Sequence, residues 1–205
     1  MAIERQIRPQ FSLLSALLLL TIAGMAIVIV QLWREVGPLR EEVRRLRDEV
    51  GAISVEDATK VYAIRVDTDD DLAWKWRIWL PENRVYVLRS HGEDVPKTGF
   101  PPAGGSIWLR EPGEHVVVYR IRRDERNSQW YGQLETRTGS VGSDNHPWVE
   151  WTSRTSTTDG VGKSTQAFAP NQRVEIIRHR VSQNRDSTKI EDPAAGFMIW
   201  LEPTR

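Results

Sequence analysis

An uncharged apolar run from Phe11 to Val30 constrains this chain more than any other feature. A bilayer core about 30 Å thick needs about 20 apolar residues in a helix, so the run is long enough to cross it. A cleaved signal peptide has a shorter apolar core, of about 7–15 residues, and a small-residue cleavage site, which this run lacks. Trp33 suits a membrane interface. The sequence therefore predicts an uncleaved transmembrane signal anchor over residues 11–33, after a short tail over residues 1–10.

The charged residues on the two sides of the anchor support opposite predictions of its orientation. The tail carries Arg5 and Arg8, whereas five arginines lie beyond the run, and by the positive-inside rule this count places the C-terminal side in the cytoplasm. Those five arginines, however, alternate with acidic residues in a patterned helix. A short basic tail before a long apolar run is typical of anchors that export the C-terminal part of their chain. We expect a single-pass protein of the cell membrane whose C-terminal domain is extracytoplasmic, at the cell envelope.

The segment after the anchor carries a heptad repeat. Between residues 34 and 54, apolar residues recur at alternating spacings of three and four, with valine at position a and leucine at position d: Val36, Leu39, Val43, Leu46 and Val50. β-Branched residues at a and leucine at d favour a parallel two-stranded coiled coil. The pattern predicts a coiled-coil stalk that pairs the chain with a second copy.

The charges on the flanks of this stalk agree with that pairing. Glu42 at position g faces Arg47 at position e of the partner helix in a parallel dimer. Pro38 lies inside the pattern, where it predicts a kink or a restart of the helix. The alternative is a monomeric amphipathic helix lying on its own domain. We expect a parallel homodimer, because the apolar seam and the charges agree.

The remaining chain, residues 55–205, has the pattern of an all-β domain. Short runs rich in Val, Ile, Trp and Tyr alternate with Gly, Pro, Asn and Asp clusters, without a sustained helical period. The fold class expected is mainly β, an antiparallel β-sandwich of the immunoglobulin-like or jelly-roll kind. The predicted strands are residues 60–67, 72–80, 84–90, 106–110, 115–123, 129–138, 147–151, 173–181 and 196–202.

Three strands contain an Ile-Trp-Leu unit, centred on Trp79, Trp108 and Trp200. Because side chains alternate across a strand, Ile and Leu share one face and the tryptophan takes the other. With Ile and Leu inside, the three tryptophans form a candidate ligand-binding platform for a sugar or a partner protein. The favoured alternative is that they pack under the long loops at 91–104, 152–172 and 182–195, or point inward with Ile and Leu outside.

Composition removes several classes of function. Lys and Arg total 28 and Asp and Glu total 28, so the chain lacks the basic surplus of a nucleic-acid-binding protein. No cysteine is present, which excludes disulfides, thiolate catalysis and thiolate zinc sites.

Two short motifs imitate known sites. Residues 160–165 (GVGKST) resemble the end of a phosphate-binding loop, but Thr157 stands where the first glycine belongs, and we expect a mobile loop. The acidic run 67–71 begins like a calcium loop, but it lacks the central glycine and places Ile78 at the position of the closing glutamate. The four histidines have no metal spacing. The sequence therefore predicts no metal site and no cofactor.

The layout of tail, span and heptad stalk resembles small bitopic envelope proteins such as bacterial division scaffolds. The resemblance covers residues 1–54, carries no specific motif and transfers no functional residue. We expect a membrane-anchored structural or adaptor protein rather than an enzyme, with an envelope protein or a glycan as its possible partner. The alternatives are a carbohydrate- or peptidoglycan-binding module that uses surface tryptophans, and an enzyme with a dispersed active site.

Overall fold

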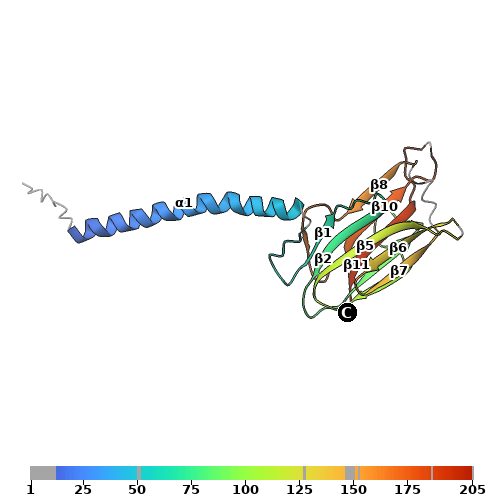
Figure 1. Cartoon of the computed structure of the whole chain (residues 1–205), viewed down its shortest axis with the longest axis horizontal. Helices are drawn as coiled ribbons and strands as arrows, with labels where there is room; N and C mark the ends of the chain where they lie inside the picture. The colour runs from blue at the N-terminus through green and yellow to red at the C-terminus, as the bar shows by residue number, and fades with distance from the viewer. Residues whose placement is uncertain are drawn as a thin grey trace, which may run out of the picture. The chain divides into compact units, whose positions relative to one another are not determined.

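A computed structural model describes residues 13–49, 52–126, 128–145, 151, 153–185 and 187–204. The chain divides into two compact units, Met1–Leu46 and Arg47–Arg205. It is mainly β, with one N-terminal helix and two antiparallel sheets (Figure 1). The predicted tail 1–10 lies outside the described residues, as does the start of the predicted anchor.

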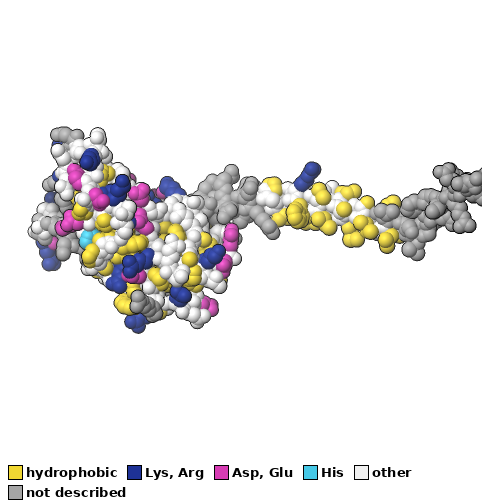
Figure 2. Space-filling model, turned by 180° about the vertical axis from the view of Figure 1, so that it is seen from behind, with side chains coloured by type: hydrophobic (Ala, Val, Ile, Leu, Met, Phe, Trp, Pro, Cys, Tyr) yellow, Lys and Arg dark blue, Asp and Glu magenta, His cyan; other side chains and the backbone are white. Residues whose placement is uncertain are grey.

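Helix α1 spans Leu13–Glu49, and Pro38 lies inside it, so the helix does not restart there. Among the described residues, Leu20–Pro38 is long and apolar enough to cross a membrane. Its large apolar side chains are uncovered, with 76% of Leu20 and 60% of Ile27 exposed, and Figure 2 shows apolar side chains along this part of the helix.

The structure bears on the predicted stalk only through its backbone. The backbone is helical at Leu39, Glu42, Val43, Leu46 and Arg47, but their side chains lie outside the described part of the chain. The side chain of Val36 is exposed, and Val50 is outside the described residues. Coiled-coil pairing therefore stays a prediction.

The strands form two antiparallel sheets. The first, sheet A, has the order β7-β6-β5-β2-β1-β9, and the second, sheet B, has the order β4-β3-β11-β10-β8. The strands are β1 Val61–Val66, β2 Ala73–Leu80, β3 Tyr86–Gly92, β4 Gly105–Leu109, β5 Gly113–Arg123, β6 Trp130–Thr136, β7 Gly139–Asn145, β8 Ser156–Gly160, β9 Gln166–Phe168, β10 Val174–Val181 and β11 Ala195–Pro203.

The two sheets enclose one hydrophobic core, as in a β-sandwich. Sheet A contributes Trp76 and Val117 among others, and sheet B contributes Leu88, Ile177 and Ile199. Strands such as β2 and β5 turn alternate side chains inward, which buries the apolar positions of the pattern. The strand order differs from the four-plus-three order of a constant-type immunoglobulin domain.

Most of the predicted strands are present, with shifts of a few residues at their ends. The exception is 147–151, which lies outside the described residues except for Trp151, a buried core residue. Three strands had no counterpart in the prediction: β7, β8 and β9. All three are edge strands, and their sequences are mostly small and polar.

Candidate functional site

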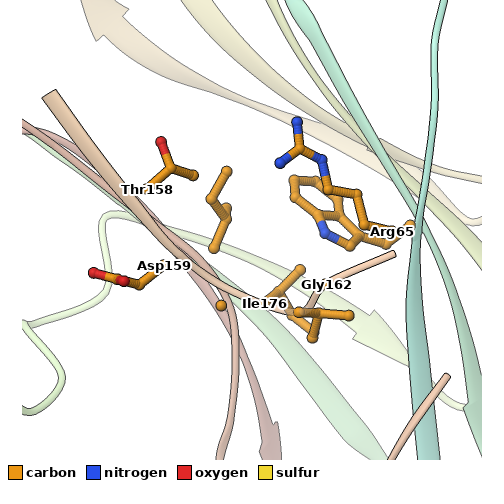
Figure 3. Close-up of a pocket in the computed structure, with 9 residues that line it drawn as sticks. Arg65, Thr158, Asp159, Gly162 and Ile176 are labelled. Carbon is orange, nitrogen blue, oxygen red and sulfur yellow. The ribbon is translucent and has the colours of Figure 1, made fainter. Parts of the chain in front are cut away.

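A cavity of about 260 Å³ lies between the sheets, where β1 of sheet A faces β8 and β10 of sheet B (Figure 3). Its walls are Arg65 and Trp76 from sheet A, the segment 158–162, and two isoleucines of β10, Ile176 and Ile177. The chain crosses from β8 to β9 along this side, and β8 and β9 are the edge strands of their sheets. The cavity is therefore at an open side of the sandwich.

Gly160 ends β8 in a conformation that favours glycine, with a φ of +122°. The next residue, Val161, donates its N–H to the carbonyl of Ile176 at 3.0 Å, which draws the crossing segment onto β10. A Cβ on Gly160 would lie 2.4 Å from the same carbonyl oxygen. Glycine is thus required for this close approach of two backbones.

Residues 161–165 form a loop between β8 and β9, as predicted, and its mobility stays a prediction. Val161 is 5% exposed and belongs to the core, and the carbonyl of Gly162 accepts the N–H of Arg65 at 2.8 Å. Strand β9 comes directly after it, so the segment is not succeeded by the helix that a phosphate-binding loop requires. The glycines here serve packing between the sheets.

Arg65 gives the cavity its charge. The side chain is half-buried, and within the described part of the chain no hydrogen bond or ion pair is made by its guanidinium. Asp159 also borders the cavity, but it is exposed and its carboxylate points away from Arg65 (Figure 3). The indole N–H of Trp76 is buried and meets no acceptor among the described residues. The cavity therefore presents unused hydrogen-bond donors and one uncompensated positive charge.

His179 of β10 lies next to Thr158, which lines this cavity, and 8% of the histidine is exposed. Its Nδ1 is 2.8 Å from the hydroxyl of Thr158, and its ring packs against Trp74 and Phe197. Burial lowers the pKa of His179 to about 4, because the charged imidazolium is poorly solvated there. At neutral pH the ring is therefore uncharged and acts as a packing element.

Two buried arginines of β10 hold a loop over the outer face of sheet B. Arg178 is paired with Glu175 and donates to the carbonyls of Pro96 and Gly99. Arg180 donates to the carbonyl of Val95 at 3.3 Å. Sequence reasoning missed both residues, because arginine in an alternating strand reads as solvent-facing.

The three predicted tryptophans do not gather at one place. Trp79 is half-buried on the outer face of sheet A, and Trp108 is 52% exposed at the edge of sheet B, with Arg110 over its ring. Trp200 is 2% exposed, under the loop that carries Phe100. Trp200 therefore offers no surface to a ligand, and Trp108 is the most accessible of the three.

A second hollow, of about 440 Å³, lies at the β2–β3 turn and is lined by Pro81, Arg84 and Pro170 among others. Its arginine already donates to the carbonyl of Pro170 at 3.4 Å. Within the described ranges no group of three or more His, Asp or Glu could hold a metal ion. The cavity at Arg65 is thus the better candidate for a binding site, because the guanidinium of its arginine has no hydrogen-bond partner among the described residues.

Comparison with known proteins gives no relative from which a function could be transferred. No family model matches the chain, and no curated protein and no solved structure matches it. Function must therefore be inferred from the residues of this chain alone.

Proposed function

We propose that this protein is a single-pass membrane protein that presents its β-domain at the cell envelope as a structural or adaptor module. The observation that supports it is the uncovered apolar surface of Leu20–Pro38, of which none is buried by the rest of the chain. Transfer of apolar side chains such as Leu20 and Ile27 from water into a bilayer core lowers the free energy. The β-domain has a core of its own.

The anchor is tested by extracting membranes that contain the full chain. We expect the protein to stay in the membrane pellet in alkaline carbonate and to be released by detergent. The double variant I22R/I27R should lower the membrane-bound fraction, because each arginine costs about 2.5–3.5 kcal/mol at the centre of a spanning helix. The matched variant R122Q, in the β-domain, should stay in the pellet. Release of the unmodified chain by carbonate alone would contradict the proposal.

A parallel homodimer through the stalk is the finer part of this proposal. It rests on the heptad pattern and on a helix that continues to Glu49. Charges at Val43 and Leu46 (V43D/L46D) should abolish crosslinking of two copies in membranes, whereas R45D, at an outward heptad position, should not. An unchanged dimer yield in V43D/L46D would remove the stalk from the proposal.

Glycan binding is a second candidate, which the exposure of Trp108 favours. An exposed indole ring stacks on the apolar face of a sugar. If Trp108 binds glycan, W108A should lose retention on immobilised peptidoglycan or chitin, whereas W79A, whose ring is half-buried, should keep most of it. Equal retention of W108A and the unmodified chain would exclude this candidate.

A further inference from the structure

We propose that the open edge of β8 binds an extended peptide as an added strand, and that a carboxylate of this peptide pairs with Arg65 in the adjoining cavity. The inference gives the proposed adaptor role a class of partner, an acidic polypeptide segment. It depends on neither the anchor nor the dimer, so it can fail or hold independently of both.

Strand β8 has the features of a strand that accepts a partner. It ends sheet B, pairs with β10 from Ser156 to Gly160, and all five of its residues are exposed. In the described part of the chain no strand pairs with its other side. An unpaired edge presents a row of N–H and C=O groups to which an extended peptide can bond.

The cavity lies where the side chains of such a peptide would point. Thr158, Asp159 and Gly160 of β8 line the cavity, and Arg65 borders it from the opposite sheet (Figure 3). Successive side chains of a strand alternate between the two faces of its sheet. Every second side chain of an added strand would therefore face the gap between the sheets, on the side of Arg65.

The charge of Arg65 selects a carboxylate. Other arginines on the two sheets already have glutamate partners, as in the pairs Arg89–Glu202 and Arg120–Glu135. Arg65 has no such partner among the described residues, and its neighbours in the cavity include Val161 and Ile177. A guanidinium binds a carboxylate through paired hydrogen bonds, and apolar walls strengthen the attraction by lowering the local dielectric constant.

A peptide suits this site better than a free small acid. The volume, about 260 Å³, is smaller than the roughly 300–1,000 Å³ usual for small-molecule pockets. The cavity alone offers a single positive charge, that of Arg65, whereas the edge of β8 adds several main-chain bonds. Backbone pairing supplies affinity and the cavity supplies selectivity, which is the usual division in strand addition.

The test uses the full chain in detergent micelles and an acetylated, amidated octapeptide of four Thr-Glu repeats. Every glutamate of this peptide lies on one face in a strand, so any register that points one glutamate inward points all of them inward. We expect the peptide to shift the amide signals of 156–160 and the indole N–H signal of Trp76 in ¹H–¹⁵N spectra. The matched Thr-Gln peptide should bind about tenfold more weakly, since it lacks the charge-assisted bond.

Variants of the protein locate the interaction. R65Q should lower the affinity for the Thr-Glu peptide to that for the Thr-Gln peptide, and R110Q, at the exposed ring of Trp108, should leave it unchanged. Two methylated peptides test the strand pairing: one carries N-methyl groups on every glutamate backbone amide, and the other on every threonine backbone amide. One of these two peptides should fail to bind, because only one of the two sets of N–H groups pairs with β8. The spectrum of R65Q itself shows whether the variant is folded.

Several results would overturn the inference. These are no shift of the named signals at millimolar Thr-Glu peptide, equal affinity for the two peptides, or an unchanged affinity in R65Q. Binding that survives both methylations would exclude strand addition. Equal shifts from N-acetylglutamate methylamide at the same concentration would indicate a pocket for small acids instead of a peptide site.

Discussion

Gly160 allows the end of β8 to lie directly against the backbone of β10. A side chain there meets the backbone of Ile176 and also requires a φ of +122°, so two costs combine. We expect G160A to lower the free energy of unfolding by about 1–3 kcal/mol. Urea denaturation of the full chain in micelles, followed by tryptophan fluorescence, measures it. G139A is the matched control, because nothing lies within 4 Å of a Cβ at Gly139; an equal loss in both variants would contradict a special role for Gly160.

His179 should make the domain less stable in mild acid. The unfolded chain protonates this imidazole below its ordinary pKa of 6.5, whereas the folded chain resists protonation until about pH 4. The unfolded state therefore binds more protons between these values, and stability that is present above pH 6.5 is lost as the pH falls towards 4. The loss is at most about 3 kcal/mol. Urea midpoints measured from about pH 7 to 4 should fall, and H179Q should fall less; parallel curves would contradict the role of His179.

Single residues were predictable where a strand has two distinct faces. The Ile-Trp-Leu units are confirmed in this respect: Ile78, Leu80, Ile107, Leu109, Ile199 and Leu201 belong to the core, and the tryptophans take the other face. Which tryptophan is covered could not be predicted, because a loop distant in sequence decides it. Phe100 and Val95 bury Trp200, and neither is near it along the chain.

At the scale of elements, the loop over sheet B is attached by Arg178. R178M leaves the carbonyls of Pro96 and Gly99 without their charged donor, and we expect a loss of about 3 kcal/mol of stability. Hydrogen exchange should accelerate across residues 93–100. R89M is the control, since Arg89 is partly exposed and its pair with Glu202 contributes about 1 kcal/mol or less. Unchanged exchange in R178M would show that the loop is held by other contacts.

The sequence pattern located the strands that bury much apolar surface and missed those that bury little. The central strands β2 and β5 alternate buried residues with more exposed ones, and the sequence prediction found both. Strands β8 (STTDG) and β9 (QAF) bury little, so their sequences resemble a loop. The cavity between β1, β8 and β10 was unpredictable for a related reason, because Arg65 and Thr158 belong to elements that only the sheet order brings together.

At the scale of the whole molecule, the side of the membrane that the β-domain occupies is a separate prediction. We expect it outside the cytoplasm, so a periplasmic-type reporter such as alkaline phosphatase, fused after Arg205, should be active. A reporter that fluoresces only in the cytoplasm, fused at the same residue, should be dark. The reverse result would favour the arginine count beyond the anchor over the layout of the tail.

The position of β11 determines when the domain can fold. This last strand lies in the middle of sheet B, between β3 and β10, and it contributes Phe197, Ile199 and Leu201 to the core. During synthesis helix α1 emerges before the β-domain, and β11 emerges after the other ten strands. Sheet B thus cannot be completed before β11 has been synthesised, and its pairings are distant in sequence and slow to form. If the β-domain is exported as we propose, the chain that is passed across the membrane is one whose sheet B stays incomplete until β11 has joined it.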